Sequence, residues 1–186
     1  MHPNFMILVL WLAFTAFWLV SAFGTKKYVP GSRRRGFAIR ILFIVAVWLL
    51  FHNPAVRRYM GHHPFSSDPT IQIAGILICA AGMAFAFWAR VHLGRNWGVP
   101  MSLREGHELV TTGPYRLVRH PIYAGILLAC LGSGLAADNW WWFIAFLFFL
   151  AYFTYSVRIE EKAMMRQFPD QYPEYKRKTR GSILPF

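Results

Sequence analysis

Acidic residues are scarce in this chain of 186 residues. It has 8 Asp and Glu against 20 Lys and Arg, which gives a formal net charge of +12. Charged residues make up only 15% of the chain, whereas soluble domains contain about 25%. Because 56% of the residues are apolar, the composition excludes a disordered chain and argues against a water-soluble fold. The position of the cations decides whether so basic a chain binds nucleic acid.

Cysteine is also scarce, which limits the chemistry that the chain can carry. The two cysteines, Cys79 and Cys130, both lie within apolar runs. That placement is typical of small buried side chains and argues against a disulfide or a metal site. The neighbouring His62 and His63 have no further ligand residues at helical spacing, which favours solvated loop histidines. We therefore expect no bound metal.

Long apolar runs dominate the sequence. Residues 5–23, 71–89 and 140–157 are each long enough to cross a membrane as a helix. Two shorter runs, 37–51 and 122–137, would cover about 22–24 Å of a hydrocarbon core of about 30 Å. We predict an all-α integral membrane protein with about five transmembrane helices, the last two forming a C-terminal helical hairpin. The first run lacks the basic start and the cleavage site of a signal peptide, so we expect a retained helix.

The cations fall mainly on one side of these five spans. Eighteen lie in the loops 24–40 and 90–120 and in the tail after residue 157, whereas only Arg57 and Arg58 lie on the other side. The positive-inside rule then predicts an outside N-terminus and a cytoplasmic C-terminus. Most of the positive charge thus reports topology, and we expect no nucleic-acid partner. We expect a multi-pass protein of a prokaryotic inner membrane.

The chain divides into two unlike regions. Residues 1–69 are predicted to form two transmembrane helices with their connectors. Residues 70–186 hold nearly all the side chains that could bind a ligand or take part in catalysis. Their polar segment between the third and fourth spans is about thirty residues long, and long non-spanning segments of this kind are commonly functional. We expect a cytoplasmic pocket in this second region.

A short helix is expected at the end of the polar segment. Thr112 is a candidate cap, and Pro121 is expected to interrupt the helix. Residues 115 and 119 would then lie one turn apart, as would residues 116 and 120. Such a helix would bring together two rings and three potential cations: Tyr115, Arg116, Arg119 and His120. Either this group forms part of a site or it is a basic collar that contacts anionic lipid.

Two carboxylates follow the last span directly. Glu160 and Glu161 make up a quarter of the acids in the chain, and they lie on the side where the cations gather. One interpretation is a helix that continues into water with solvated charges. The other is that one carboxylate turns toward the polar segment and offers a negative site for a cationic ligand.

Several short motifs of the second region match a known family in order and spacing. They are His107-Glu108-Leu109-Val110, Gly113-x-Tyr115, Arg119-His120-Pro121-x-Tyr123-x-Gly125, Glu160-Glu161 and Phe168-x-x-x-Tyr172-x-x-Tyr175. Together they resemble the isoprenylcysteine carboxyl methyltransferase family, and related phospholipid methyltransferases share much of the pattern. The resemblance covers residues 70–186, whereas the first two helices resemble nothing specific.

The resemblance implies a membrane methyltransferase that uses S-adenosyl-L-methionine. The methyl acceptor would be the carboxylate of an isoprenylcysteine, or a similar lipid-borne carboxylate, entering from the bilayer. The family's substrate arginine falls here on Ser156, so Arg158 is the candidate for that catalytic role. Glu161 is the near alternative to Glu160 as the tail carboxylate of the cofactor site. The cofactor contacts that the resemblance implies are His107, Glu108, Leu109, Val110, Tyr115, His120, Pro121, Ile122, Tyr123 and Glu160.

The chemistry of the cofactor fits these residue types. It carries a sulfonium, an amine and a carboxylate, so its pocket needs an anion, hydrogen-bond donors and aromatic rings. Alternatives remain open: a phospholipid N-methyltransferase, an NADPH-dependent membrane reductase of the sterol-reductase type with Arg116 and Arg119 at the phosphate, or a membrane scaffold or small transporter. Residues 132–137 match G-x-G-x-x-A, but inside a span they indicate close helix packing, within the monomer or between chains.

Overall fold

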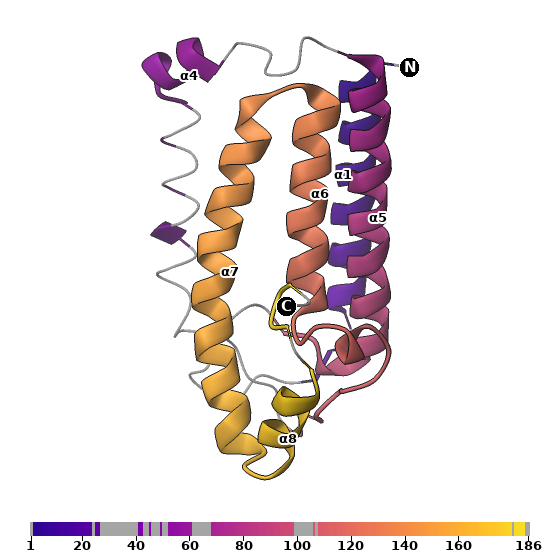
Figure 1. Ribbon diagram of the computed structural model, residues 1–186, viewed down its shortest axis with the longest axis vertical. Helices are drawn as coiled ribbons and strands as arrows, with labels where there is room; N and C mark the ends of the chain where they lie inside the picture. Colours follow the sequence, from indigo (N-terminus) through magenta and orange to yellow (C-terminus); the bar gives the residue numbers. More distant parts are fainter. Residues whose placement is uncertain are drawn as a thin grey trace.

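Helices form all the regular elements in the described part of the chain (Figure 1). The computed structural model describes residues 2–23, 25–26, 41–42, 45, 49, 52–60, 68–98, 106, 108–179 and 181–184. The helices are α1 (Pro3–Ala22), α4 (Pro54–Met60), α5 (Pro69–Leu93), α6 (Pro121–Ala137), α7 (Trp140–Gln167) and α8 (Gln171–Lys178). Two short 3₁₀ helices, η1 (Gly94–Asn96) and η2 (Gly113–Arg116), lie between α5 and α6. The all-α prediction is confirmed for these residues.

Three described helices are long and apolar enough to cross a membrane: α1, α5 with its continuation η1, and α7. They correspond to the first, third and fifth predicted spans. Helix α6 has 17 apolar-rich residues, and at about 1.5 Å per residue it is about 25 Å long. Most of the second predicted span, 37–51, lies outside the described residues, which include only 41, 42, 45 and 49 of it, so a total of five spans stays a prediction.

Local sequence determines where these helices begin and end. Asp68 caps α5, because its carboxylate accepts a hydrogen bond of 2.7 Å from the backbone N–H of Thr70. Asp138 ends α6 in the left-handed conformation, with φ of +48°. Asn139 then caps α7 by accepting a hydrogen bond of 2.8 Å from the N–H of Trp141. This two-residue connection produces the predicted C-terminal hairpin of α6 and α7.

Helices α5 and α6 pack backbone to backbone. A Cβ atom added to Gly82 would lie 2.6 Å from backbone atoms of both Gly125 and Ala129. A Cβ atom added to Gly132 would lie 2.3 Å from the backbone nitrogen of Cys79. Any larger side chain at these positions would force the two helices apart. The small-residue faces left open by the sequence therefore pack within the monomer.

Helix α1 joins the same bundle through a polar contact inside the apolar interior. The indole Nε1 of Trp11 donates a hydrogen bond of 3.0 Å to the Ser133 hydroxyl on α6, which itself donates to the Ala129 carbonyl. Trp11 also stacks on Trp142 of α7 at a centroid distance of 5.3 Å. Side-chain hydrogen bonds of this kind stabilise helix contacts in membranes. The first helix is thus packed against the second region of the chain.

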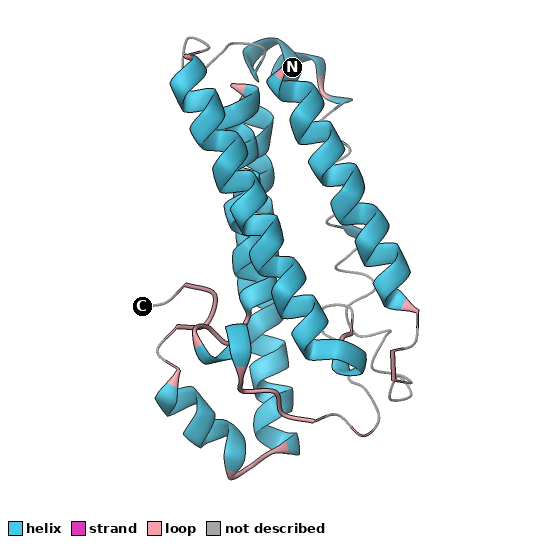
Figure 2. Cartoon of the chain, turned by 90° about the vertical axis from the view of Figure 1, so that its right-hand side faces the viewer, coloured by secondary structure: helices cyan, strands magenta, loops and turns pink. Residues whose placement is uncertain are grey.

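The elements that carry chemistry gather at one end of the bundle. Figure 1 shows the ends of α1 and α5, the start of α6, and α8 at the lower end, whereas α4 and the α6–α7 turn lie at the upper end. Helices α1 and α5 run in the same direction, from the upper to the lower end. Figure 2 shows the C-terminal segment returning from α8 toward the start of α6.

The expected short helix over residues 115–120 is wrong. The helical turn η2 ends at Arg116, and Val118 instead forms a parallel β-bridge with Gly181. Pro121 occupies the first turn of α6 and so begins a helix, where its missing N–H costs nothing. Thr112 occupies the cap position of η2 but makes no capping hydrogen bond with its side chain; its hydroxyl pairs with His92 Nε2 at 2.8 Å. The C-terminal segment supplies backbone acceptors that favour extended structure here, and sequence patterning does not reveal them.

Candidate active site

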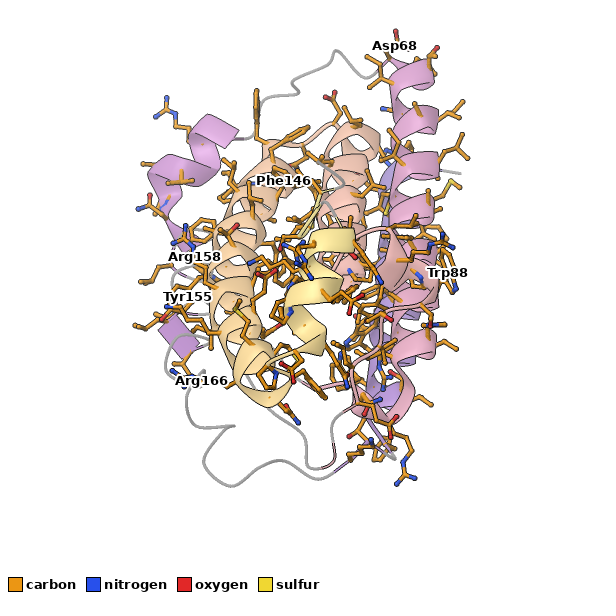
Figure 3. The ribbon with its side chains drawn as sticks, turned by 60° about the horizontal axis from the view of Figure 1, so that its bottom comes forward. Asp68, Trp88, Phe146, Tyr155, Arg158 and Arg166 are labelled. Carbon is orange, nitrogen blue, oxygen red and sulfur yellow. The ribbon has the colours of Figure 1, made fainter. Side chains whose placement is uncertain are left out.

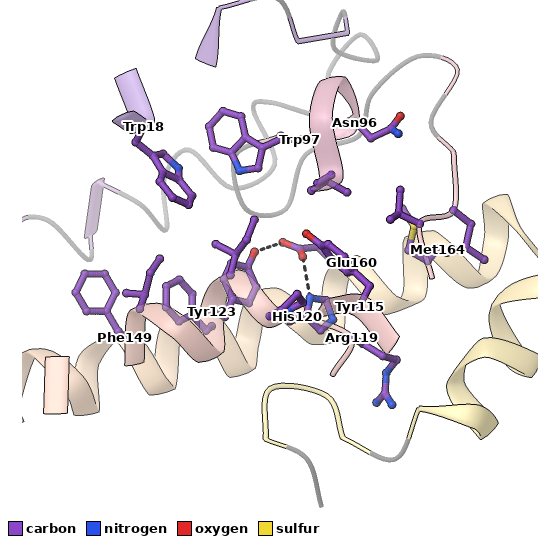
Figure 4. Close-up of a pocket in the computed structure, with 18 of the residues that line it drawn as sticks. Trp18, Asn96, Trp97, Tyr115, Arg119, His120, Tyr123, Phe149, Glu160 and Met164 are labelled. Atoms are coloured by element: carbon purple, nitrogen blue, oxygen red, sulfur yellow. Dashed lines mark hydrogen bonds and ion pairs between the residues drawn. The ribbon is translucent and has the colours of Figure 1, made fainter. Parts of the chain in front are cut away.

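A cavity of about 470 Å³ lies between α1, α6, α7 and the polar segments that precede α6 and follow α7 (Figure 4). This volume falls within the range of about 300–1,000 Å³ that is typical of small-molecule sites. One part is polar and is lined by Asn96, Tyr115, Arg119, His120, Glu160, Tyr172 and Tyr175. The other part is apolar and is lined by Trp11, Phe14, Trp18, Ile126, Phe149, Tyr152 and Phe153. A ligand with a polar head and an apolar chain matches this division.

Glu160 provides a carboxylate to the cavity. Its Oε1 accepts a hydrogen bond of 2.7 Å from the Tyr123 hydroxyl, and its Oε2 lies 3.6 Å from Nδ1 of His120 (Figure 4). The Tyr123 ring stacks with Phe153 at 4.2 Å and with His120 at 5.5 Å. The side chain of Glu160 retains 21% exposure. A partly exposed carboxylate among aromatic rings is suited to a cationic group.

Glu161 lies in a different environment. Its carboxylate accepts hydrogen bonds of 2.8 Å from Arg119 Nε and 2.7 Å from Lys176 Nζ, and its side chain is only 11% exposed. Successive helical residues point about 100° apart, so Glu161 faces α8 and the C-terminal segment while Glu160 lines the cavity. Of the two carboxylates that the sequence left open, the geometry therefore favours Glu160 as a ligand-binding group.

His120 lies between these two carboxylates. Its Nδ1 lies 3.6 Å from Glu160 and its Nε2 lies 3.7 Å from Glu161. The Nε2 atom is buried and has no hydrogen-bond partner among the described residues. Buried polar atoms normally have hydrogen-bond partners, and the Glu161 carboxylate is the anion that lies beside this nitrogen. The backbone N–H of His120 donates a hydrogen bond of 2.8 Å to the Ser182 carbonyl.

Tyr115 forms another wall of the polar part. Its carbonyl accepts a hydrogen bond of 2.6 Å from the Tyr175 hydroxyl, and its ring stacks on His92 at 6.4 Å. Gly113, with φ of +59°, shapes the turn that carries Tyr115; a Cβ atom there would lie 2.8 Å from the His92 ring. Burial raises the pKa of Tyr175 to about 12 and raises that of Tyr115 further, so both hydroxyls remain protonated donors.

The cavity brings together most of the cofactor contacts that the resemblance implies. Those that line it are Leu109, Val110, Tyr115, His120, Pro121, Ile122, Tyr123 and Glu160. Glu108 does not line it: its side chain is 76% exposed and pairs with Lys26 Nζ at 3.2 Å. His107 lies outside the described residues. The roles of all these residues remain predictions, which the geometry now makes testable.

Arg158 does not line the cavity. Its side chain is exposed on the side of α7 that faces away from α6 and α8, next to Tyr155 (Figure 3). Ser156, at the family's arginine position, is buried, and its hydroxyl donates to the Tyr152 carbonyl at 2.8 Å. The geometry therefore gives no support to the prediction that Arg158 orients a substrate.

The arginine pair predicted for an NADPH phosphate is not assembled. Arg116 is exposed at the end of η2, whereas Arg119 is 8% exposed and is bound to Glu161. Arg119 also donates a hydrogen bond of 2.7 Å to the Thr179 carbonyl. Its guanidinium is thus engaged within the protein. Among the described residues, no group of three or more His, Cys, Asp or Glu could hold a metal ion.

Sequence reasoning missed the aromatic wall that α1 contributes. Trp11, Phe14 and Trp18 all line the cavity from one face of that helix. Their spacing of three and four residues is the signal that could have indicated a shared face. Trp97 was also missed; it lines the cavity while its ring contacts the guanidinium of Arg90, 4.7 Å from the centroid.

Comparison with known proteins identifies the family. The sequence profile described as phospholipid methyltransferase matches residues 70–171, which include η2, α6, α7 and Glu160. A probable protein-S-isoprenylcysteine O-methyltransferase of Oryza sativa is 30% identical over 115 residues, covering 61% of this chain and 54% of the rice protein. The protein-S-isoprenylcysteine O-methyltransferase of Saccharomyces cerevisiae is 38% identical over 81 residues, covering 43% and 34%.

A bacterial relative carries a different name. The cobalt-zinc-cadmium resistance protein of Cupriavidus metallidurans is 36% identical over 106 residues, covering 55% of this chain and 47% of that protein. The chain spans about half the length of the rice relative that it matches. Because the family profile covers more than half of the sequence and the motifs at the cavity lie within it, the chain belongs to the isoprenylcysteine and phospholipid methyltransferase family.

Proposed function

We propose that this chain transfers a methyl group from S-adenosyl-L-methionine to a lipid-borne acceptor, with an isoprenylcysteine carboxylate or a similar carboxylate as the main candidate. The observation that carries the proposal is the position of Glu160 where a polar pocket joins an aromatic, apolar one. The names of the rice and yeast relatives support the same reaction class.

The residues of the polar part fit the cofactor chemically. Glu160 would pair with its positive end, and the rings of Tyr115 and Trp97 would contact adenine or the sulfonium. His120, which also lines the cavity, is a candidate hydrogen-bond donor to the carboxylate of the cofactor. When bound, the cofactor supplies a methyl group on a sulfonium, which is an electrophile that an acceptor can attack in line.

The protein's part in the reaction is positioning and the exclusion of water. A carboxylate acceptor is already ionised at neutral pH, so no side chain has to remove a proton. The aromatic residues of α1 and α7 would hold the acceptor's hydrocarbon chain, so that its head lies beside Glu160 and His120. Holding two reactants in contact in a dry pocket lowers the barrier by reducing the entropy lost on reaction.

One observation favours a phospholipid amine as the second candidate. Arg119 is the only lysine or arginine among the described residues that line the cavity. Glu161 already binds its guanidinium. A carboxylate acceptor would therefore need another cation, whereas an amine would not. An ammonium must lose its proton before it attacks, so the rate of amine methylation should rise with pH through the pKa of the amine or its base, while carboxylate methylation should stay nearly flat near neutrality.

The test uses the purified chain in lipid nanodiscs. Calorimetry should show binding of S-adenosyl-L-methionine, and labelled cofactor should transfer its methyl group to one of two acceptors, a farnesylcysteine or a phosphatidylethanolamine. Empty nanodiscs are the control for nonspecific partitioning. The pH profile of the active acceptor then distinguishes the two candidates. No cofactor binding, together with no labelled product from either acceptor, would refute the proposed function.

A further inference from the structure

The end of the described chain forms a short strap across the start of α6. We define the C-terminal strap as Thr179 and residues 181–184. Gly181 pairs with Val118 in a parallel bridge, and the carbonyls of Gly181 and Ser182 accept hydrogen bonds from Arg119 N–H at 3.2 Å and His120 N–H at 2.8 Å. The strap lies outside residues 70–171, which the family profile matches.

His120 depends on the strap for its backbone position. It has φ of −126° and ψ of +63°, so it belongs neither to η2 nor to the regular part of α6. The residue that follows is Pro121, which has no N–H to donate. The hydrogen bonds from the N–H groups of Arg119 and His120 to the strap therefore take the place of helical hydrogen bonds. They hold the backbone of the residue whose side chain lies 3.6 Å from Glu160.

Two anchors hold the strap in place. Ile183 is 8% exposed and packs in the apolar cluster that contains Tyr115 and Tyr123, whereas the next residue, Leu184, is 47% exposed. Arg119 provides the second anchor, because its guanidinium binds the Thr179 carbonyl at 2.7 Å and Glu161 at 2.8 Å. The Ser182 hydroxyl also lies 3.4 Å from Glu161.

We propose that the C-terminal strap is a positioning element of the active site, which Ile183 and the Arg119–Glu161 pair hold so that His120 faces Glu160. Glu161 then acts on the cofactor site through the strap and His120 and not by direct contact. The proposal rests on the proposed function only for the identity of the ligand.

The matched pair Ile183→Ala and Leu184→Ala tests the proposal. Amide hydrogen exchange at Arg119 and His120 reports the strap directly, without any ligand. We expect protection of these amides to fall about tenfold or more in Ile183→Ala and to stay unchanged in Leu184→Ala. Calorimetry should then show a rise of about tenfold in the Kd for S-adenosyl-L-methionine in Ile183→Ala alone.

A second variant, Glu161→Gln, tests the other anchor of the strap. It should raise the Kd and lower the amide protection of Arg119 and His120, and Glu161→Asp should restore part of both. The ring resonance of His120 in a histidine-labelled NMR spectrum should shift in Ile183→Ala, which leaves the charges beside the ring unchanged. If Ile183→Ala fails to fold, Ile183→Val gives the same readouts in a milder form. Two results would overturn the proposal. One is lost amide protection in Ile183→Ala with an unchanged Kd and an unchanged His120 ring resonance. The other is an equal effect of Ile183→Ala and Leu184→Ala.

If the parent protein binds no cofactor, the proposed function fails. The strap is then judged by amide protection and the His120 resonance alone, so the two failures are distinguishable. An unchanged ring resonance in Ile183→Ala, despite lost protection, would in that case count against positioning.

Discussion

Replacing Glu160 with glutamine removes the one carboxylate that lines the described cavity while keeping the shape of the side chain. The amide oxygen of glutamine can still accept the hydrogen bond from Tyr123, which is 2.7 Å long in the parent. The local packing should therefore survive, and the change acts on charge. We expect Glu160→Gln to weaken binding of S-adenosyl-L-methionine, because the positive end of the cofactor loses its anion.

The magnitude follows from the environment of the carboxylate. Glu160 is 21% exposed and lies among aromatic rings, so water screens its charge only in part. Losing a hydrogen bond to a charged group costs about 1.5–3 kcal/mol, which corresponds to a rise in Kd of about 10- to 150-fold. Tyr123→Phe leaves the charge but removes its neutral partner, so it should raise the Kd by about three- to tenfold.

The assay is calorimetric titration of the cofactor into protein in nanodiscs, with thermal melting to show that each variant is folded. Glu174→Gln is the matched control, because this carboxylate lies at the same end on α8, is 54% exposed and pairs with Lys178. The control should bind like the parent. A folded Glu160→Gln variant with the parent's affinity would refute the assignment of Glu160 as the anion of the cofactor site.

Three further changes test the fold and the site. Gly132→Val should prevent the close packing of α5 and α6, because even a Cβ atom there would lie 2.3 Å from the α5 backbone. The folded fraction in detergent should fall, and a variant that melts like the parent would contradict this prediction. Ser133→Ala removes the hydrogen bond from Trp11 on α1 and should lower the free energy of unfolding by about 0.6–2 kcal/mol. Denaturation in detergent measures this change, and an unchanged midpoint would mean that ring stacking alone holds α1. Arg158→Gln should leave cofactor affinity and methyl transfer within about twofold of the parent, since surface changes usually have small effects; a large loss of transfer with intact binding would restore the catalytic role that the family resemblance implies.

Helix patterning predicted the long elements well because it depends on local composition. The apolar runs that begin near residues 5, 71 and 140 became α1, α5 and α7, and the Asp138-Asn139 connection produced the expected hairpin. The polar segment was harder to predict. There, hydrogen bonds from a distant part of the chain determined the backbone, and no local signal in residues 115–120 reveals them.

The candidate site shows the same division. Order and spacing of motifs drew attention to Tyr115, His120, Tyr123 and Glu160, and these residues line one cavity. Sequence proximity was a poor guide for Arg158, because a residue two positions from Glu160 on a helix points to another side. It could not separate Glu160 from Glu161 either, since their difference comes from Arg119 and Lys176 on other elements.

The sequence by itself determined that this is a helical membrane protein with its cations on one predicted side, because hydrophobic length and charge distribution are properties of a linear chain. It also determined the family, because the order and spacing of short motifs can be read along the chain. Only the tertiary structure decided which carboxylate lines the pocket, that α1 supplies an aromatic wall, and that the C-terminal strap holds His120. Those features are contacts between segments 60 or more residues apart, or side chains pointing to different sides of one helix, and they exist only once the helices have packed.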